Sequence, residues 1–387
     1  MANEGLITVR IGSAAAVPHL LWSEGMRVCL PRSIVDESEC FREQGPQGSV
    51  VLRPPFANAD WEAVHRLRTT AAFTQERPTS SRLPFSYQKV PPLIRSAVAS
   101  VTGRLQRHRE SRWAAFPMWP LDLSADFLAD LVNGKPSPFI GLPTPVILSH
   151  DLDSPEGLEN LVNRFLEIEE EAGARSANYI VPNGWPIRHD LLQEVKQRGH
   201  EIGIHGYDHA NRTPFADATE RRHRLESARE LIDRYNIIGY RAPSLLRTPE
   251  LLQDLSRYYR YDSSVPTSGG LFPVPNNGCA SARPFLLEGI AELPLSLPRD
   301  GSLRFFGYAP AELTGIWVQC TERIARSGGV VVMLTHCENR FSGSACMLDA
   351  YRKFLGYIAS SKQYEWSTPL RVLQNALGKS WVHRDGR

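Results

Sequence analysis

From residue 143 onward, apolar and polar positions follow two alternating patterns. Short apolar runs such as 146–149 and 201–204 predict strands covered on both faces, because such strands have no polar side to expose. Between them, as in 155–173, apolar residues recur every three or four positions, which predicts amphipathic helices. Further strands are expected at 177–181, 237–241, 258–262, 291–297 and 329–335, and further helices at 189–198, 217–235, 310–326, 346–360 and 369–377.

The alternation of strands with helices predicts an α/β fold. Each helix returns the chain to the same edge of the sheet, so the strands are expected to be parallel. The number of apolar runs indicates a distorted (β/α) barrel of about seven to eight strands. We expect this domain to span 141–378, followed by a short tail at 379–387.

Residues 1–140 follow a different pattern, for which we expect an N-terminal α+β region. Strands are predicted at 6–11, 26–30 and 49–52, helices at 60–70, 93–110 and 122–131, and a proline-rich loop or linker at 74–92. The basic charge of 93–110 is typical of a solvated helix face. No motif in this region could be tied to chemistry, so its role stays open.

Composition narrows the class of protein. A net charge of +2 over 387 residues gives no field that would favour nucleic acid or an anionic membrane. No apolar window approaches the ~20 residues of a membrane span, and the first residues lack the pattern of a signal peptide. The six cysteines are scattered, which favours free thiols over a disulfide framework. We therefore expect a cytoplasmic protein.

Two pairs of titratable residues follow apolar runs. Asp151 and Asp153 come after 146–149, and His205 and His209 come after 201–204. On a helix, a spacing of four would project both imidazoles from one face. One carboxylate and two imidazoles suit a divalent metal, so we expect Asp153, His205 and His209 to be ligands. Asp151 would then contact metal-bound water as a general base.

Three more polar residues end predicted strands, namely Arg241, Asp262 and His336. His336 would protonate a leaving amine, and Arg241 would orient Asp151 through a fork of hydrogen bonds. Each also has a structural explanation, since such residues often serve core packing, a surface ion pair or the capping of a loop. His150 is expected to be a packing residue, because on a strand it points away from Asp151.

In this order the motifs resemble the polysaccharide deacetylase family, the NodB-like carbohydrate esterases. The resemblance covers about 143–377. It rests on five motifs, namely SHDLD at 149–153, HGYDH at 205–209, RAP at 241–243, YDSS at 261–264 and LTH at 334–336. The first motif is the variant with one residue between the two aspartates. It implies a distorted barrel, a divalent metal and removal of an acyl group, commonly acetyl, from an amino sugar. The metal is usually zinc, with cobalt, nickel or manganese as alternatives.

The resemblance also implies site residues. It gives Asp151 as base, Asp153, His205 and His209 as metal ligands and His336 as acid, with Arg241 orienting the base. Leu334 would line the pocket for the acyl methyl group, the backbone N–H of Ser244 would hold the oxyanion, and Pro243 and Tyr207 would contact substrate.

The chain departs from the family pattern at the fourth motif. That motif lacks its usual downstream tryptophan, which leaves Asp262 as the candidate partner of His336. The third motif lacks the aromatic residue and the glycine that often follow its proline. Together with a long loop at 266–286 and the unexplained N-terminal region, these departures indicate a specialised substrate.

Three functions remain open at this point. The leading hypothesis is a metal-dependent deacetylase acting on an N-acetylated amino sugar or glycoconjugate. The second is an amidase of cyclic or purine-derived C–N bonds on the same barrel. The third is a sugar-binding protein without turnover, against which the intact base and acid argue.

Overall fold

The computed structural model describes the barrel domain and parts of the region before it. The described residues are 6–11, 27–31, 41–44, 50–53, 78–82, 89–110, 121, 123, 126, 139 and 141–378, except 268–277 and 280. The N-terminal strands β1 (Leu6–Ile11), β2 (Arg27–Pro31), β3 (Phe41–Gln44) and β4 (Val50–Arg53) form one sheet in the order β2-β1-β4-β3. Three of these strands were predicted, and β3 was not.

Two helices precede the barrel. The short α3 (Thr79–Arg82) lies in the segment predicted as a loop or linker, and α4 (Pro92–Glu110) confirms the helix predicted at 93–110. The helix predicted at 60–70 lies outside the described residues, as does most of the one predicted at 122–131.

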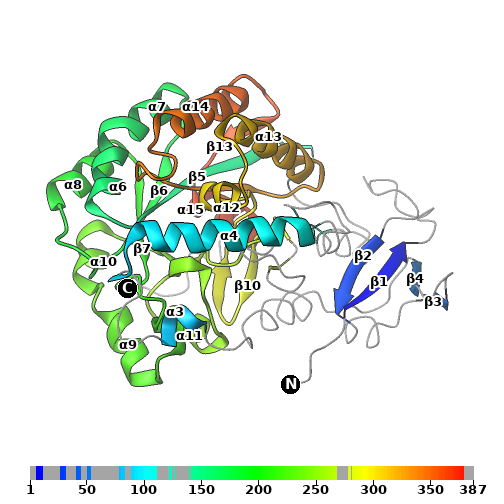
Figure 1. The fold of residues 1–387 in the computed structure, drawn as a ribbon, viewed down its shortest axis with the longest axis horizontal. Helices are drawn as coiled ribbons and strands as arrows, with labels where there is room; N and C mark the ends of the chain where they lie inside the picture. The colour runs from blue at the N-terminus through cyan, green and yellow to red at the C-terminus, as the bar shows by residue number, and fades with distance from the viewer. Residues whose placement is uncertain are drawn as a thin grey trace.

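The main sheet has nine strands among the described residues (Figure 1). They are β5 (Thr144–Leu152), β6 (Ser176–Ile180), β7 (Glu201–His205), β8 (Gly239–Arg241), β9 (Tyr261–Asp262), β10 (Phe285–Leu287), β11 (Ile290–Glu292), β12 (Val331–His336) and β13 (Tyr364–Trp366). Their order is β10-β11-β9-β8-β7-β6-β5-β12, and β13 also pairs with β5. All pairs are parallel except the β10–β11 hairpin.

The sheet curls toward closure. The N–H of Leu297, in the segment after β11, donates to the carbonyl of Val332 in β12 at 3.1 Å. The two ends of the strand order therefore approach each other. This arrangement confirms the α/β class and the distorted barrel predicted from the sequence.

Helices and short helical turns surround the curled sheet and the ends of its strands (Figure 1). They are α6 (Pro155–Asn160), η3 (Leu161–Phe165), α7 (Leu166–Glu171), α8 (His189–Gln197), η4 (Thr213–Phe215), α9 (Ala218–Glu226), α10 (Arg229–Tyr235), η5 (Pro243–Leu245), α11 (Pro249–Leu255), α12 (Asp300–Phe305), α13 (Pro310–Arg326), α14 (Ala345–Ala359) and α15 (Pro369–Leu377). The single helix predicted at 217–235 is wrong, because the chain forms α9 and α10 there. The Ser227 hydroxyl donates to the Arg224 carbonyl at 2.7 Å, a local bond that competes with helix continuation.

Side-chain alternation along β5 separates the site from the outer core. Ile147 belongs to the apolar cluster inside the barrel, whereas Val146 and Leu148 pack with the helices. Because successive strand residues point to opposite faces, Asp151 shares the inner face with Ile147. His150 points outward, as predicted.

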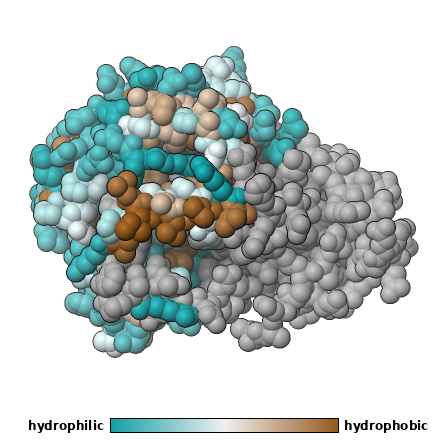
Figure 2. Space-filling view, viewed as in Figure 1, coloured by the Kyte–Doolittle hydropathy of each residue, from teal (hydrophilic) through white to brown (hydrophobic). Residues whose placement is uncertain are grey.

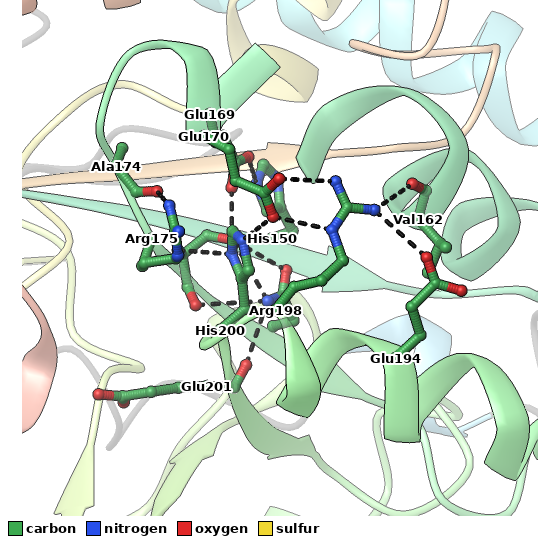
Figure 3. A network of polar contacts seen from close by, with 12 residues as sticks. His150, Val162, Glu169, Glu170, Ala174, Arg175, Glu194, Arg198, His200 and Glu201 are labelled. Carbon is green, nitrogen blue, oxygen red and sulfur yellow. Dashed lines mark hydrogen bonds and ion pairs between the residues drawn. The ribbon is translucent and has the colours of Figure 1, made fainter. Parts of the chain in front are cut away.

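The outward side of β5 holds a buried polar network (Figure 3). His150 Nε2 lies 2.7 Å from Glu169 Oε1, and the Tyr351 hydroxyl donates to the same oxygen at 2.9 Å. Burial alone would raise the pKa of Glu169, but His150 outweighs it and the pKa is lowered. The network joins the sheet to the surrounding helices and takes no part in the site.

The interior of the barrel pairs tyrosines with glycines on neighbouring strands. A Cβ atom at Gly203 would lie 2.5 Å from Tyr179 Cδ1, and one at Gly239 would overlap the ring of Tyr261. The two phenol groups meet, since the Tyr179 hydroxyl donates to that of Tyr261 at 3.1 Å. The absence of a side chain at the two glycines therefore makes room for the rings that fill the barrel.

Helix α4 turns its large apolar side chains outward (Figure 2). Its exposed residues are Leu93, Ile94, Val98, Val101 and Leu105. Its opposite face packs on α12, where a Cβ at Gly103 would overlap the backbone of Phe305. No helix among the described residues is long and apolar enough to cross a lipid bilayer.

We expect Gly203→Ala to destabilise the barrel. The added methyl group must displace the Tyr179 ring in a packed interior, which costs about 1–3 kcal/mol of unfolding free energy. Urea unfolding would measure it, with Gly356→Ala in α14 as control. Nothing lies within 4 Å of a Cβ at Gly356, so that variant should gain about 0.5–1 kcal/mol. Equal stability of Gly203→Ala and wild type would contradict this account of the interior.

Candidate metal and catalytic site

Three predicted ligands meet at the carboxyl ends of β5 and β7. Asp153 Oδ1 lies 3.2 Å from His209 Nε2 and 3.6 Å from His205 Nε2. One ligand atom from each residue lies within 4.8 Å of the others. The three side chains therefore form a group that could hold one metal ion, as the sequence predicted.

The two histidines meet through a turn and not through a helix. His205 is the last residue of β7, and the chain then reverses with φ of 69° at Gly206 and 56° at His209. A Cβ at Gly206 would overlap the Pro243 ring, so the turn needs glycine there. The prediction that His205 and His209 lie on one face of a helix is therefore wrong. Their side chains nevertheless lie close together, as that prediction required.

A backbone contact sets the tautomer of His205. Its Nδ1 lies 3.0 Å from the Arg241 carbonyl, which can only accept a hydrogen bond, so Nδ1 carries the proton. Nε2 then carries the lone pair, which points toward the carboxylates of Asp151 and Asp153. Burial lowers the pKa of His205 to about 4, which keeps the imidazole neutral. A neutral imidazole held in this way is prepared to bind a metal.

Asp153 has the properties of the third ligand. Burial would raise its pKa, but His209 outweighs this effect and keeps the carboxylate ionised. Apart from its contacts with the two imidazoles, Oδ1 is buried without a hydrogen-bond partner. A buried oxygen of this kind beside two imidazole nitrogens fits a divalent cation.

Arg241 holds Asp151, the candidate base. The Arg241 Nη1 donates to Asp151 Oδ1 at 2.9 Å, as predicted. The predicted fork on the carboxylate is absent, because Nη2 donates instead to the hydroxyls of Ser149 and Ser263 at 3.0 and 3.1 Å. The guanidinium also lies 4.0 Å above the Tyr179 ring. Asp151 Oδ2 is left directed toward His205 Nε2, at 3.6 Å.

The partner of His336 is Asp300 and not Asp262. His336 Nδ1 lies 2.8 Å from Asp300 Oδ1, and the backbone N–H of His336 donates to Oδ2 at 2.9 Å. The Ser342 hydroxyl donates to Oδ2 as well, at 2.7 Å. Burial alone would lower the pKa of His336, but Asp300, with smaller contributions from Asp153 and Asp151, raises it to about 9.

Asp262 points away from the site because of strand alternation. Tyr261 occupies the inner face of β9, so the next residue faces outward. There Asp262 is fully buried opposite Glu292 of β11 and accepts from the Ser264 hydroxyl at 2.6 Å. Burial and the neighbouring Asp262 raise the pKa of Glu292 well above its usual range, so this pair retains a proton. The predicted catalytic role of Asp262 is therefore wrong.

The predicted substrate residues lie around the same strand ends. Leu334 is buried on the inner face of β12, two residues before His336. Ser244 is exposed with φ of 54°, and we find no acceptor for its N–H among the described residues. Pro243 packs on the Gly206 turn, and the Tyr207 ring lies under the guanidinium of Arg224 at 5.0 Å.

Sequence reasoning missed two acidic residues beside the site. Asp300 follows the apolar segment 291–297, the position type that identified Asp151, so the signal was present. Glu338 is buried and accepts from the Asp153 N–H at 3.0 Å and the Ser154 hydroxyl at 2.8 Å. The sequence around Glu338 carries no signal for this role, because its partners, Asp153 and Ser154, lie far away in the chain.

Comparisons with known proteins agree with this geometry. The family model for polysaccharide deacetylases matches residues 144–260, a segment that carries Asp151, Asp153, His205, His209 and Arg241. No curated protein sequence matches the chain.

Several solved structures are similar. A protein of Mycobacterium smegmatis assigned as a polysaccharide deacetylase is 19% identical, covering 61% of this chain and 91% of that chain with a TM-score of 0.48. A protein of Pseudomonas aeruginosa PAO1 with the same assignment is 14% identical, with 66% and 97% coverage and a TM-score of 0.48. The Puue allantoinase is 16% identical, with the same coverage and a TM-score of 0.50, a likeness of fold alone. Residues 144–260 thus match the polysaccharide deacetylase family, the family that the sequence motifs resemble.

Proposed function

We propose that the protein is a metal-dependent deacetylase that removes an N-acyl group, most simply acetyl, from an amino sugar or glycoconjugate. The observation that carries the proposal is the meeting of Asp151, Asp153, His205, His209 and His336 at one end of the barrel. Binding alone would need neither an oriented carboxylate base nor a protonated imidazole opposite it. The family match supports the same reaction class.

The metal would be held by Asp153, His205 and His209, and we propose zinc for this donor set. When bound there, a divalent cation would polarise the acyl carbonyl and lower the pKa of the attacking water.

Asp151 takes the proton of the attacking water. Arg241 occupies Oδ1, so Oδ2 is the oxygen available for this transfer. Burial alone would raise the pKa of Asp151, but nearby positive charges, which include Arg241 and His336, outweigh this effect and lower the pKa, so the carboxylate remains ionised and able to accept. The Ser244 N–H, which is unpaired among the described residues, is available to the oxygen of the reacting carbonyl.

His336 gives its proton to the leaving amine. Asp300 fixes Nδ1, so Nε2 is the nitrogen that meets the substrate. The raised pKa keeps this imidazole protonated at neutral pH, as a general acid requires. Leu334, on the same face of β12, is placed to contact the acyl methyl group.

Ligand and base variants should separate metal binding from turnover. His205→Ala and Asp153→Ala are expected to lose metal, because each removes one of three donors. Asp151→Asn should keep metal and lose activity by on the order of 100-fold or more, since the amide cannot accept the proton. Elemental analysis and the release of acetate from an N-acetylglucosamine oligomer would measure the two properties. Full activity in Asp151→Asn would rule out its role as base.

Asp300→Asn should move the pH profile. Asp300 raises the pKa of His336, so the imidazole stays protonated to higher pH in the wild type. Removing the carboxylate lowers that pKa, and the alkaline limb of kcat/KM should move to lower pH with metal content unchanged. His336→Ala is the companion variant and should lose turnover without losing metal. An alkaline limb that stays in place in Asp300→Asn would contradict the assignment of His336 as acid.

A further inference from the structure

Arg299 places a guanidinium near the candidate base and the partner of the candidate acid. It directly precedes α12, next to Asp300, and is partly exposed. Its side chain makes no hydrogen bond or ion pair with any residue in the described part of the chain. An arginine has five donors, and holding them partly buried without acceptors is unfavourable.

The charge of Arg299 acts on the catalytic carboxylates. Its pKa is lowered, first by burial and also by Arg241, while Asp151, Asp300 and Asp153 act in the opposite direction. Asp151 and Asp300 already have partners, because Asp151 is held by Arg241 and Asp300 by His336 and Ser342. The donors of Arg299 are therefore left for a ligand.

Arg340 brings a second guanidinium to the same side. Its Cζ lies 4.8 Å from the centroid of the Phe341 ring, its Nε is buried without a hydrogen-bond partner, and its Nη2 is 3.7 Å from Asp153 Oδ2. The Phe341 ring in turn lies 4.8 Å from the His336 ring and within 3.3 Å of a Cβ at Gly301. Phe341 is thus the shared neighbour of the segments that carry Arg299, Arg340 and His336.

The position of these arginines relative to the barrel decides which part of a substrate they would meet. Arg299 and Arg340 belong to the segments on either side of β12, which carries the acid His336. Ser244, which follows β8, lies on the other side of β5 and β7 in the sheet order. The arginines therefore flank the strand whose acid serves the leaving amine.

We infer that the substrate carries an anionic group, a carboxylate or a phosphate, on its amine-bearing part, and that Arg299 and Arg340 bind it. The inference rests on the proposed deacetylation and adds the substrate class. Guanidinium groups match the geometry of both anions, and a charge-assisted contact of this kind contributes more than a neutral one. A neutral sugar would leave Arg299, and the Nε of Arg340, without an acceptor.

Three probes test the inference with metal-loaded protein: methyl N-acetylglucosaminide as the neutral probe, N-acetylmuramic acid for a carboxylate and N-acetylglucosamine 1-phosphate for a phosphate. At least one anionic probe should have a kcat/KM 10-fold or more above the neutral one, mainly through KM. Arg299→Gln should reduce that preference by about 10–100-fold. The matched control is Arg304→Gln, an exposed arginine in α12, the helix that Arg299 precedes, and it should keep the preference. The probe that is preferred identifies the anion.

Calorimetric binding of the same probes to Asp151→Asn separates this inference from the proposed reaction. If no probe is deacetylated but an anionic probe binds and Arg299→Gln weakens it, the anion site stands and the reaction is wrong. Equal binding and turnover of neutral and anionic probes would overturn the anion site. An Arg299→Gln variant that lowers kcat equally for all probes would also overturn it, because Arg299 would then stabilise the transition state of every substrate. Absence of binding by either anionic probe would overturn it as well.

Discussion

The buried guanidinium of Arg241 is the interaction on which the other parts of the site depend. A charge without solvent must be paired, and Arg241 is paired with Asp151 and two hydroxyl groups while it lies over the Tyr179 ring. Its own carbonyl fixes the tautomer of His205. One residue at the end of β8 thus couples the candidate base, one metal ligand and the packing of the interior.

The site has two halves that meet across β5. On one side, β7 and β8 supply the imidazoles and Arg241, so the metal group and the base form one unit. On the other side, β12 and α12 supply His336, Asp300 and the unpaired Arg299. The first half leaves Asp153 Oδ1 and the Ser244 N–H without hydrogen-bond partners among the described residues, and the second leaves the donors of Arg299.

Much of this architecture could be predicted from the sequence, because apolar runs and strand ends carry most of the information. Asp151, Asp153, His205, His209, Arg241 and His336 were identified from their positions after such runs. The prediction for Asp262 failed for a physical reason. Asp262 also ends a strand, but it follows the inward-facing Tyr261 by one residue, so its side chain points to the outer face of the sheet. Asp300 was missed although it also follows an apolar segment, because Pro298 and Arg299 separate it from that segment and it begins a short helix.

The tyrosine–glycine pairs inside the barrel also bear on how this sequence can change over generations. Tyr179 needs an empty position at Gly203, and Tyr261 needs one at Gly239, so neither member of a pair can be replaced freely by itself. The pairs are linked through the two phenol groups, and Tyr179 also supports Arg241. Descendants of this sequence would have to vary these four positions together or keep them. The interior beneath the site is thereby an evolutionary constraint.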